Sequence, residues 1–372
     1  MLHRLEVADC RLALEWIVKL QTKLMTALCD PKIQAPDITA AWAQNVLPDI
    51  ESDWVSRYCG WYRTKGTNKH SMLERMKALA ALPTVDRHQC LVHLKDNLEF
   101  CLAFDPAAHP PATRPRDKAL SKKASDVYRE LLEAFYLIAL NNGFPVKADG
   151  SAGKDFKHAD VVTTAQAANP KLKVCPLCDG GKDGSELDHW LPKENFPELC
   201  CHPYNLVEIC AACNGTENKG SKPVLNAEAL EPFADWFHPY LRSAHDTFAV
   251  TIAKGMVSLD ALDPVNRRRV ENLDCLVNLG SRWTNEYRTQ FQRVQEKIRC
   301  RIGRRQQVSA GTLETLLIDW REDARAQIGL MPNAMMEVAL LSIACDTRSH
   351  VFEELSIYAD EEHCAFLSDN LV

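Results

Sequence analysis

The sequence has no apolar run of about 18 residues, the length that a membrane-spanning helix needs. It also lacks the continuous apolar start of a secretory signal, because Arg4, Glu6 and Asp9 interrupt its first residues. We therefore expect no membrane segment and no secretion. An excess of positive charge is missing too. The 372 residues carry a net charge of −6, so only a local basic stripe could attract a polyanion.

Cysteine is plentiful by contrast, and its 15 copies are an odd number. Together with the missing signal, this indicates a reducing cytoplasm rather than a disulfide scaffold. The hydrophobic share of 46% and the charged share of 25% are those of an ordinary globular protein. The chain is long enough for about two or three domains with a sizeable core.

Four of the cysteines form two Cys-x-x-Cys pairs, Cys175 with Cys178 and Cys210 with Cys213. Zinc takes four tetrahedral ligands and favours thiolates, and each Cys-x-x-Cys turn can supply two sulfurs to one ion. The two pairs therefore predict one structural Zn²⁺ site. The alternative is four ordinary buried thiols, since a free cysteine packs as a small hydrophobe.

Three further residues between the pairs, Cys200, Cys201 and His202, could compete as ligands. Adjacent cysteines fit one tetrahedron poorly. We therefore interpret Cys200 and Cys201 as packing residues.

The segment between and after the pairs predicts a strand over 185–190, a second strand over 205–209 and a helix of about two turns over 211–219. The first strand ends at Asp188 and His189. Neighbouring residues of a strand point to opposite faces. We therefore expect these two side chains to take different roles.

The residue types indicate phosphate chemistry. Carboxylate and amide oxygens are hard ligands, so Asp188 and Asn214 predict a Mg²⁺ site. His189, with an ordinary pKa of about 6.5, could act as general base for the attack of water on phosphorus. The amide of Asn205 is expected to fix the loop or the imidazole by hydrogen bonds. Asn218 lies one helical turn after Asn214 and is a reserve metal ligand.

These residues resemble the zinc-bound form of the HNH nucleases, also called ββα-metal or His-Me finger nucleases. The resemblance covers one segment, 171–222, and rests on six matches in order: Cys175/Cys178, Asp188-His189, Leu191-Pro192, Asn205-Leu206-Val207, Cys210/Cys213-Asn214 and Lys219.

The resemblance implies hydrolysis of a phosphodiester in DNA, and it implies a role for each of the matched residues. His189 would be the general base, Asp188 and Asn214 would hold the catalytic divalent metal, and Asn205 would be the structural asparagine. The four cysteines would bind a non-catalytic zinc. The sequence departs from the family at Lys219, which lies further from Asn214 than the family's lysine does.

The departure leaves the predicted phosphate contact open between Lys219, Lys222 and Lys193. The sequence of residues 187–199, LDHWLPKENFPEL, is also similar to that of HNH nucleases of bacterial anti-phage defence systems. That similarity implies an effector whose activity is gated by partner subunits.

The residues before this segment predict helices. Asp9 is expected to cap the first one, with an apolar stripe of Leu12, Trp16, Leu20, Leu24 and Leu28. The proline-rich residues 105–118 predict a linker, and 121–141 predicts a further helix.

After the segment, 247–260 predicts a small hairpin, 264–305 a long helical stretch, and 312–327 and 333–345 two apolar helices. The polar side of the long stretch is rich in Arg267, Arg268, Arg269, Arg282, Arg288, Arg293, Lys297, Arg299, Arg301, Arg304 and Arg305. Phosphate contact is one interpretation, with Arg293, Lys297 and Arg301 as candidates. A solvated helix face is the other.

Together these features predict a mainly α protein in which helical N- and C-terminal regions surround a small zinc-bound ββα-metal module. The expected domains are 1–165, 166–225 and 226–372. The expected function is that of a metal-dependent endonuclease acting on double-stranded DNA, one strand per active site. The alternatives are a non-catalytic zinc module that binds DNA or a partner protein, and an RNA nuclease of the same chemistry.

Overall fold

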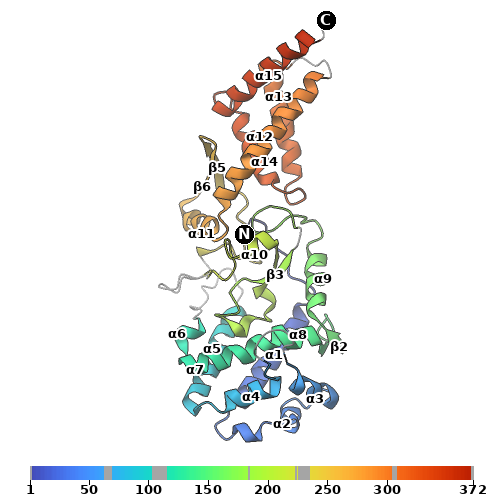
Figure 1. Cartoon of the computed structure of the whole chain (residues 1–372), viewed down its shortest axis with the longest axis vertical. Coiled ribbons are helices and arrows are strands. Elements are labelled where there is room, and N and C mark those ends of the chain that lie inside the picture. The colour runs from blue at the N-terminus through green and yellow to red at the C-terminus, as the bar shows by residue number, and fades with distance from the viewer. Residues whose placement is uncertain are drawn as a thin grey trace.

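The computed structural model of the protein describes residues 2–62, 69–102, 115–182, 185–222, 224, 235–303 and 308–369. The molecule is elongated and mainly helical, and Figure 1 shows three regions along its long axis. The N-terminal helices lie at one end, the C-terminal helices at the other, and short strands with α10 lie between them. The predicted mainly α fold class is confirmed.

The N-terminal region is a set of packed helices and short turns. Its elements are α1 (Arg11–Leu28), η1 (Ala35–Asp37), α2 (Ala40–Val46), α3 (Ser52–Gly60), α4 (Met72–Ala80), α5 (Thr84–Leu102), α6 (Arg116–Ala119), α7 (Lys122–Ala134), the π-helix η2 (Phe135–Ala139) and α8 (Leu140–Asn142). The linker predicted over 105–118 lies largely outside the described residues, apart from Pro115 and most of α6.

The first helix differs from its prediction in two respects. It begins without a side-chain cap, so Asp9 is not its N-cap. Leu12 is 45% exposed, while Leu14, Ile17 and Leu20 are buried. A stripe that steps by four residues drifts around a helix of 3.6 residues per turn, so its first member leaves the buried face.

The helix predicted over 121–141 is confirmed, with one local change. Ser121 caps it, because the Ser121 hydroxyl accepts a hydrogen bond from the Ala124 N–H. Its second half widens into the π-helix η2, and Gly143 ends it at a φ of +108°. Such π segments inside α-helices are often found at functional sites.

The middle region holds two small antiparallel sheets, β1 with β2 and β3 with β4. Its elements are β1 (Phe144–Val146), β2 (Ala152–Phe156), α9 (His158–Ala168), β3 (Glu186–His189), η3 (Pro197–Leu199), η4 (Pro203–Asn205), β4 (Leu206–Ile209) and α10 (Ala211–Asn214). Both predicted strands are present. The predicted two-turn helix is wrong in length, because α10 is a single turn. The expected domain boundary at 165/166 falls inside α9.

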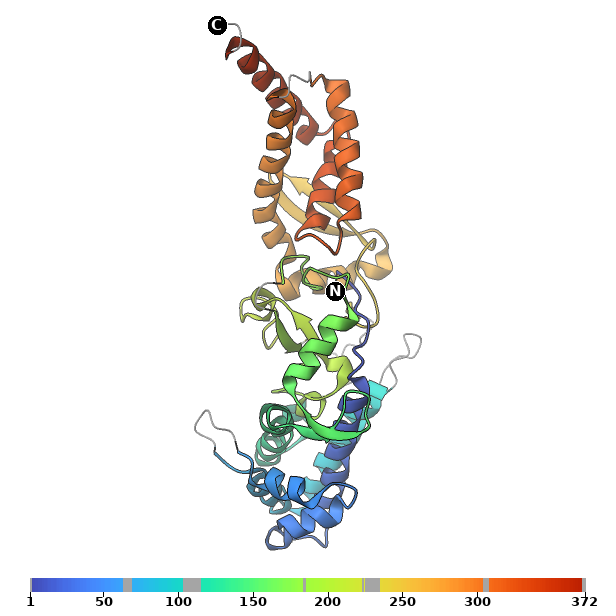
Figure 2. The ribbon, with the colours of Figure 1, turned by 90° about the vertical axis from the view of Figure 1, so that its right-hand side faces the viewer.

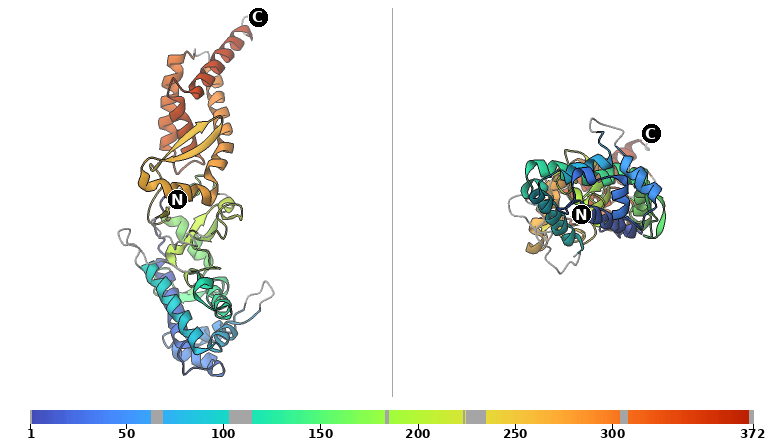
Figure 3. Two further views of the ribbon diagram at one scale, coloured as in Figure 1. Left: turned by 90° about the vertical axis from the view of Figure 1, so that its left-hand side faces the viewer. Right: turned by 90° about the horizontal axis from the view of Figure 1, so that it is seen from below.

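The C-terminal region pairs a hairpin with long helices. Its elements are β5 (Phe248–Ala253), β6 (Met256–Ala261), η6 (Pro264–Asn266), α11 (Arg267–Val277), α12 (Leu279–Gly303), α13 (Ala310–Ala326), α14 (Ala334–Ala344) and α15 (His350–Asp369). The hairpin packs on α12 and α14, as Figure 3 shows. The long predicted helix is broken at Asn278, whose φ of +52° separates α11 from α12. Arg304 and Arg305 lie outside the described residues.

The first residues of the chain run along the middle region before α1 begins (Figure 2). The His3 N–H donates to the Pro176 carbonyl at 3.1 Å, and the Leu5 N–H donates to the Pro239 carbonyl at 2.9 Å. The N-terminus therefore ties the loop of the first cysteine pair to the segment after α10.

None of the helices described here is both long and apolar enough to cross a membrane.

Candidate metal centre and its surroundings

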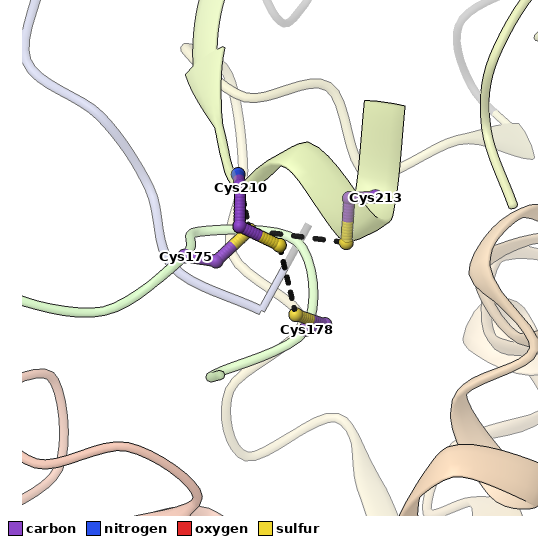
Figure 4. Close-up of side chains that lie close together, drawn as sticks. All are labelled: Cys175, Cys178, Cys210 and Cys213. Carbon is purple, nitrogen blue, oxygen red and sulfur yellow. Dashed lines mark hydrogen bonds between the residues drawn. The ribbon is translucent and has the colours of Figure 1, made fainter. Parts of the chain in front are cut away.

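The structure brings the four predicted cysteines together. Cys175 and Cys178 come from the loop before β3, Cys210 from the end of β4 and Cys213 from α10 (Figure 4). All four are buried, and their Sγ atoms lie within 4.8 Å of one another. The Cys175–Cys213 and Cys178–Cys210 Sγ pairs are 3.9 Å apart.

These distances suit a tetrahedral metal. With a Zn–S bond of about 2.3 Å, the sulfurs of a regular tetrahedron lie roughly 3.8 Å apart. Two backbone N–H groups also point at sulfurs, that of Cys210 at Cys175 Sγ and that of Gly180 at Cys178 Sγ, both at 3.4 Å. Such donors favour thiolates over thiols. The cluster could hold a metal such as zinc.

The three competing residues lie outside this cluster. Cys200 donates its S–H to the Leu132 carbonyl at 3.2 Å, and burial raises the pKa of Cys201 well above its usual value. The Nδ1 atom of His202 accepts a hydrogen bond from the Tyr204 N–H at 3.4 Å, and burial lowers the pKa of His202 to about 3. In the described part of the chain, the one group of three or more His, Cys, Asp or Glu with metal-ligand spacing is the four-cysteine cluster.

An arginine from the C-terminal region completes the surroundings of the sulfurs. Arg282 of α12 donates from Nη1 to Cys213 Sγ and from Nη2 to Cys178 Sγ, each at 3.1 Å. In the sequence, Arg282 lies on the basic side of the long helical stretch, for which phosphate contact and a solvated helix face were the two interpretations. The structure directs it to the cysteines instead.

Asp188 is buried and paired with a lysine. Its carboxylate lies 2.5 Å from Lys219 Nζ, which also donates to the His189 carbonyl at 2.7 Å. Lys219 is fully buried. Burial raises the pKa of Asp188, and the Lys219 ammonium opposes that shift. Lys219 thus holds the end of β3 rather than reaching an exposed position.

His189 lies on the other face of β3 and is 5% exposed. Its Nε2 contacts the Cys200 carbonyl at 3.0 Å, and a carbonyl can only accept, so Nε2 carries the proton. The Tyr136 ring packs edge-on at 4.5 Å between centroids, and the Tyr136 hydroxyl bonds to His158 Nε2 at 2.9 Å. Burial lowers the pKa of His189 to about 3, below the 6.5 expected from its type.

Asn205 fixes the loop that follows β3, one of the two roles predicted for it. Its Oδ1 accepts from the Leu191 N–H at 2.7 Å, and its Nδ2 donates to the Leu191 and Leu199 carbonyls, each at 3.1 Å. The side chain is buried. Asn205 therefore determines the path of the chain around His189.

The predicted Mg²⁺ ligands are engaged elsewhere. The Asn214 amide donates to the Glu186 carboxylate, and the Asp188 carboxylate is occupied by Lys219. Asn218 lies beyond the end of α10, so the helical reason for placing it beside Asn214 is wrong; its amide donates to the Ala212 carbonyl at 2.7 Å. This arrangement does not fit a divalent cation between Asp188 and Asn214.

The predicted DNA contacts are dispersed. Lys193 pairs with Glu194 at 2.9 Å, and the contacts of the Lys222 ammonium with the described residues are long, 3.3 Å to the Glu217 carbonyl and 3.5 Å to the Leu276 carbonyl.

The three candidates on α12, Arg293, Lys297 and Arg301, line a hollow of about 410 Å³ with Trp320. Lys297 is partly neutralised there by Glu337 at 2.8 Å. At roughly 1.5 Å per residue, Arg293 and Arg301 lie about 16 Å and about 28 Å along the helix from Arg282.

A buried carboxyl lies beside the His189 loop. Glu198 of η3 bonds to the Asn97 amide and accepts from the Tyr128 hydroxyl at 3.2 Å, with His93 Nε2 at 3.9 Å. Burial raises the pKa of Glu198 to about 7 and lowers the pKa of His93 to about 4. This network attaches η3 to α5 and α7.

The sequence did not indicate three residues of these surroundings, Glu198, Tyr136 and His158, nor the contact of Arg282 with the sulfurs. Tyr136, His158 and Arg282 come from segments outside the cysteine pairs. Glu198 lies between the pairs, but its partners Asn97 and Tyr128 are distant in the chain, and no spacing rule links them. No known protein family, curated protein or solved structure matches the chain.

Proposed function

We propose that the protein is an endonuclease of the HNH type that hydrolyses DNA phosphodiesters with His189 as general base. The observation that carries this proposal is one compact unit. The first strand of an antiparallel pair, β3, ends in Asp188 and His189. The second strand, β4, leads into the four-cysteine cluster. Asn205 fixes the loop beside the imidazole. A structural metal at the cysteines would keep this unit folded.

The chemistry assigned to His189 follows from its tautomer. Because Nε2 donates to the Cys200 carbonyl, the lone pair lies on Nδ1, which is the atom that would take a proton from water. Its low pKa keeps the imidazole uncharged at neutral pH. Asp188 and Lys219 act on the same strand end, where their ion pair and the Lys219 bond to the His189 carbonyl fix the backbone.

The described state is closed to substrate, since His189 is buried beneath Tyr136 and the loop that carries Cys200. We therefore propose that activity requires an opening of this contact. Such gating agrees with an anti-phage effector controlled by partner subunits. Because Asp188 pairs with Lys219 and the Asn214 amide donates to Glu186, the two residues do not fit Mg²⁺ in this arrangement, and the test is run with and without a second metal.

A non-catalytic metal module that binds DNA or a partner protein is the second candidate. Two observations favour it: the Asp188 carboxylate is already neutralised by Lys219, and His189 has little access to solvent. A module of this kind needs the four cysteines but no chemistry at β3.

The test is nicking of supercoiled plasmid by the full chain, with zinc present and with Mg²⁺, Mn²⁺ or no further metal. The expected result is an open circular product, because one site per chain cuts one strand at a time. His189→Ala should abolish it, and His350→Ala, at an exposed position of α15, should not. Labelled RNA run in parallel separates an RNA nuclease. Zinc binding without cleavage of either substrate favours the non-catalytic module.

A further inference from the structure

We propose that Arg282 donates hydrogen bonds to the sulfurs that bind the metal, and that through these bonds the metal fastens helix α12 of the C-terminal region to the cysteine cluster. Its two guanidinium nitrogens each lie 3.1 Å from a sulfur, one from each Cys-x-x-Cys pair. A single planar group therefore spans both halves of the cluster.

Charge supports this role. Four thiolates around a divalent metal leave about two net negative charges, and a guanidinium keeps its own charge under all ordinary conditions. Arg282 is half-buried, and among the described residues its guanidinium donates to Cys213 Sγ and Cys178 Sγ. The sulfurs are thus the acceptors that balance the positive charge of the guanidinium.

The position of Arg282 links the cluster to the start of α12. The helix begins directly after Asn278, whose amide donates to the Glu217 carbonyl at 3.0 Å and to Asn218 Oδ1 at 3.2 Å. These contacts place the corner between α11 and α12 against the segment that follows α10. A bound metal keeps the sulfurs as thiolates, which are the stronger acceptors. Loss of the metal should therefore weaken the attachment of this corner.

The first experiment measures zinc affinity by competition with a chromophoric chelator. Arg282→Gln removes the charge but keeps a hydrogen-bond donor, and Arg282→Lys keeps the charge but loses the planar pair of donors. Outer partners of metal sites typically contribute about 10- to 100-fold in affinity. We expect a loss of that size in Arg282→Gln, a smaller loss in Arg282→Lys, and none in Arg288→Gln, an exposed control on the same helix.

The second experiment measures hydrogen exchange over 279–290 with and without zinc. In the wild type, removal of zinc should speed exchange there. In Arg282→Gln, exchange should already be fast with zinc bound and should change little on removal.

Two results would overturn the proposal: zinc affinity within twofold of the wild type in Arg282→Gln, or an equal response of 279–290 to zinc in both proteins. A wild type that binds no zinc overturns it as well. Circular dichroism of each variant detects a failure to fold. If Arg282→Gln does not fold, Arg282→Lys supplies the comparison with the wild type.

Discussion

The middle region meets the N-terminal and C-terminal helices through different chemistry. On the N-terminal side, His189 and Tyr136 are buried and uncharged at neutral pH, burial raises the pKa of Glu198 to about 7, and the contacts are hydrogen bonds and packed rings. On the C-terminal side, Arg282 binds two sulfurs.

A second charged contact strengthens the C-terminal side. The buried carboxylate of Asp179, next to the first cysteine pair, accepts the Met335 N–H at 2.8 Å and contacts His3 at 2.7 Å. The C-terminal attachment therefore depends on the geometry of the cysteine loop. On the N-terminal side the residues before α1 contact that loop, through His3, while the contacts of α5, α7 and η2 described above lie away from it. A metal at the cysteines should therefore control the C-terminal helices more than α5 and α7.

The largest effect is expected from loss of the metal. Structural zinc can contribute about 10 kcal/mol or more to the folding of a small module. In Cys175→Ser we expect new protease cleavage sites near Cys210 and at the starts of α12 and α14, while α5 and α7 stay protected. Limited proteolysis with mass spectrometry locates the cuts.

The control for that experiment is Cys275→Ser, which changes an exposed cysteine of α11 and should leave the pattern of the wild type. Equal loosening of both helical regions would remove the difference between the two sides.

Replacement of the buried lysine should have the next largest effect. Lys219→Met leaves Asp188 as a buried carboxylate without its partner, which typically costs about 3 to 5 kcal/mol in the free energy of unfolding. Urea denaturation measures the loss. Lys222→Met, which removes the long contacts to the Glu217 and Leu276 carbonyls seen among the described residues, should change stability by about 0.5 kcal/mol or less.

The double variant Asp188→Asn with Lys219→Met should recover part of that loss, because no charge remains unpaired. If Lys219→Met proves as stable as Lys222→Met, the ion pair does not hold the strand end.

Removal of the loop-fixing amide should cost somewhat less. Asn205→Ala leaves the Leu191 N–H and the Leu191 and Leu199 carbonyls without their buried partner, for a loss of about 3 kcal/mol. Thermal unfolding measures it. Asn141→Ala, at an exposed amide that bonds only within its helix, serves as the control and should lose less than a third as much.

The smallest effect, and the one confined to the N-terminal side, is a pH dependence at Glu198. Its folded pKa of about 7 lies above the unfolded value of about 4.3, so ionisation destabilises the fold as pH rises through this window. Glu198→Gln removes that penalty. Relative to the wild type, the variant should gain roughly 2 to 3 kcal/mol between pH 5 and pH 8.

Urea denaturation at both pH values gives the difference. The wild type also loses stability in acid, because His93, His189 and His202 are held neutral with pKa values of about 4, 3 and 3. Comparison of the two proteins at each pH cancels this contribution. A pH-independent difference would show that the Glu198 pKa is not raised.

The sequence predicted what depends on local spacing. The cysteine pairs, the strands that carry Asp188 and Leu206, and the capped helix after Ser121 all follow from neighbours in the chain. The length of α10 was wrong because Gly215 and its neighbours leave the helix early, where a polar run suggested continuation.

The rest depends on contacts between distant segments. Nothing within the helix of Arg282 distinguishes it from Arg288 or Arg293, and only the packing of α12 against the cysteines does. The same holds for Lys219, one of three candidates for a phosphate contact, which is buried in an ion pair with Asp188. Burial, which a sequence does not give, also sets the His189 pKa far from the value of a free imidazole.

The metal content of the purified chain tests the central claim most directly. Native mass spectrometry, combined with elemental analysis, should find one zinc ion per wild-type chain and none in the variant with both Cys178→Ser and Cys213→Ser. A wild type that carries no metal after refolding with zinc, and whose four thiols react freely, would contradict the account.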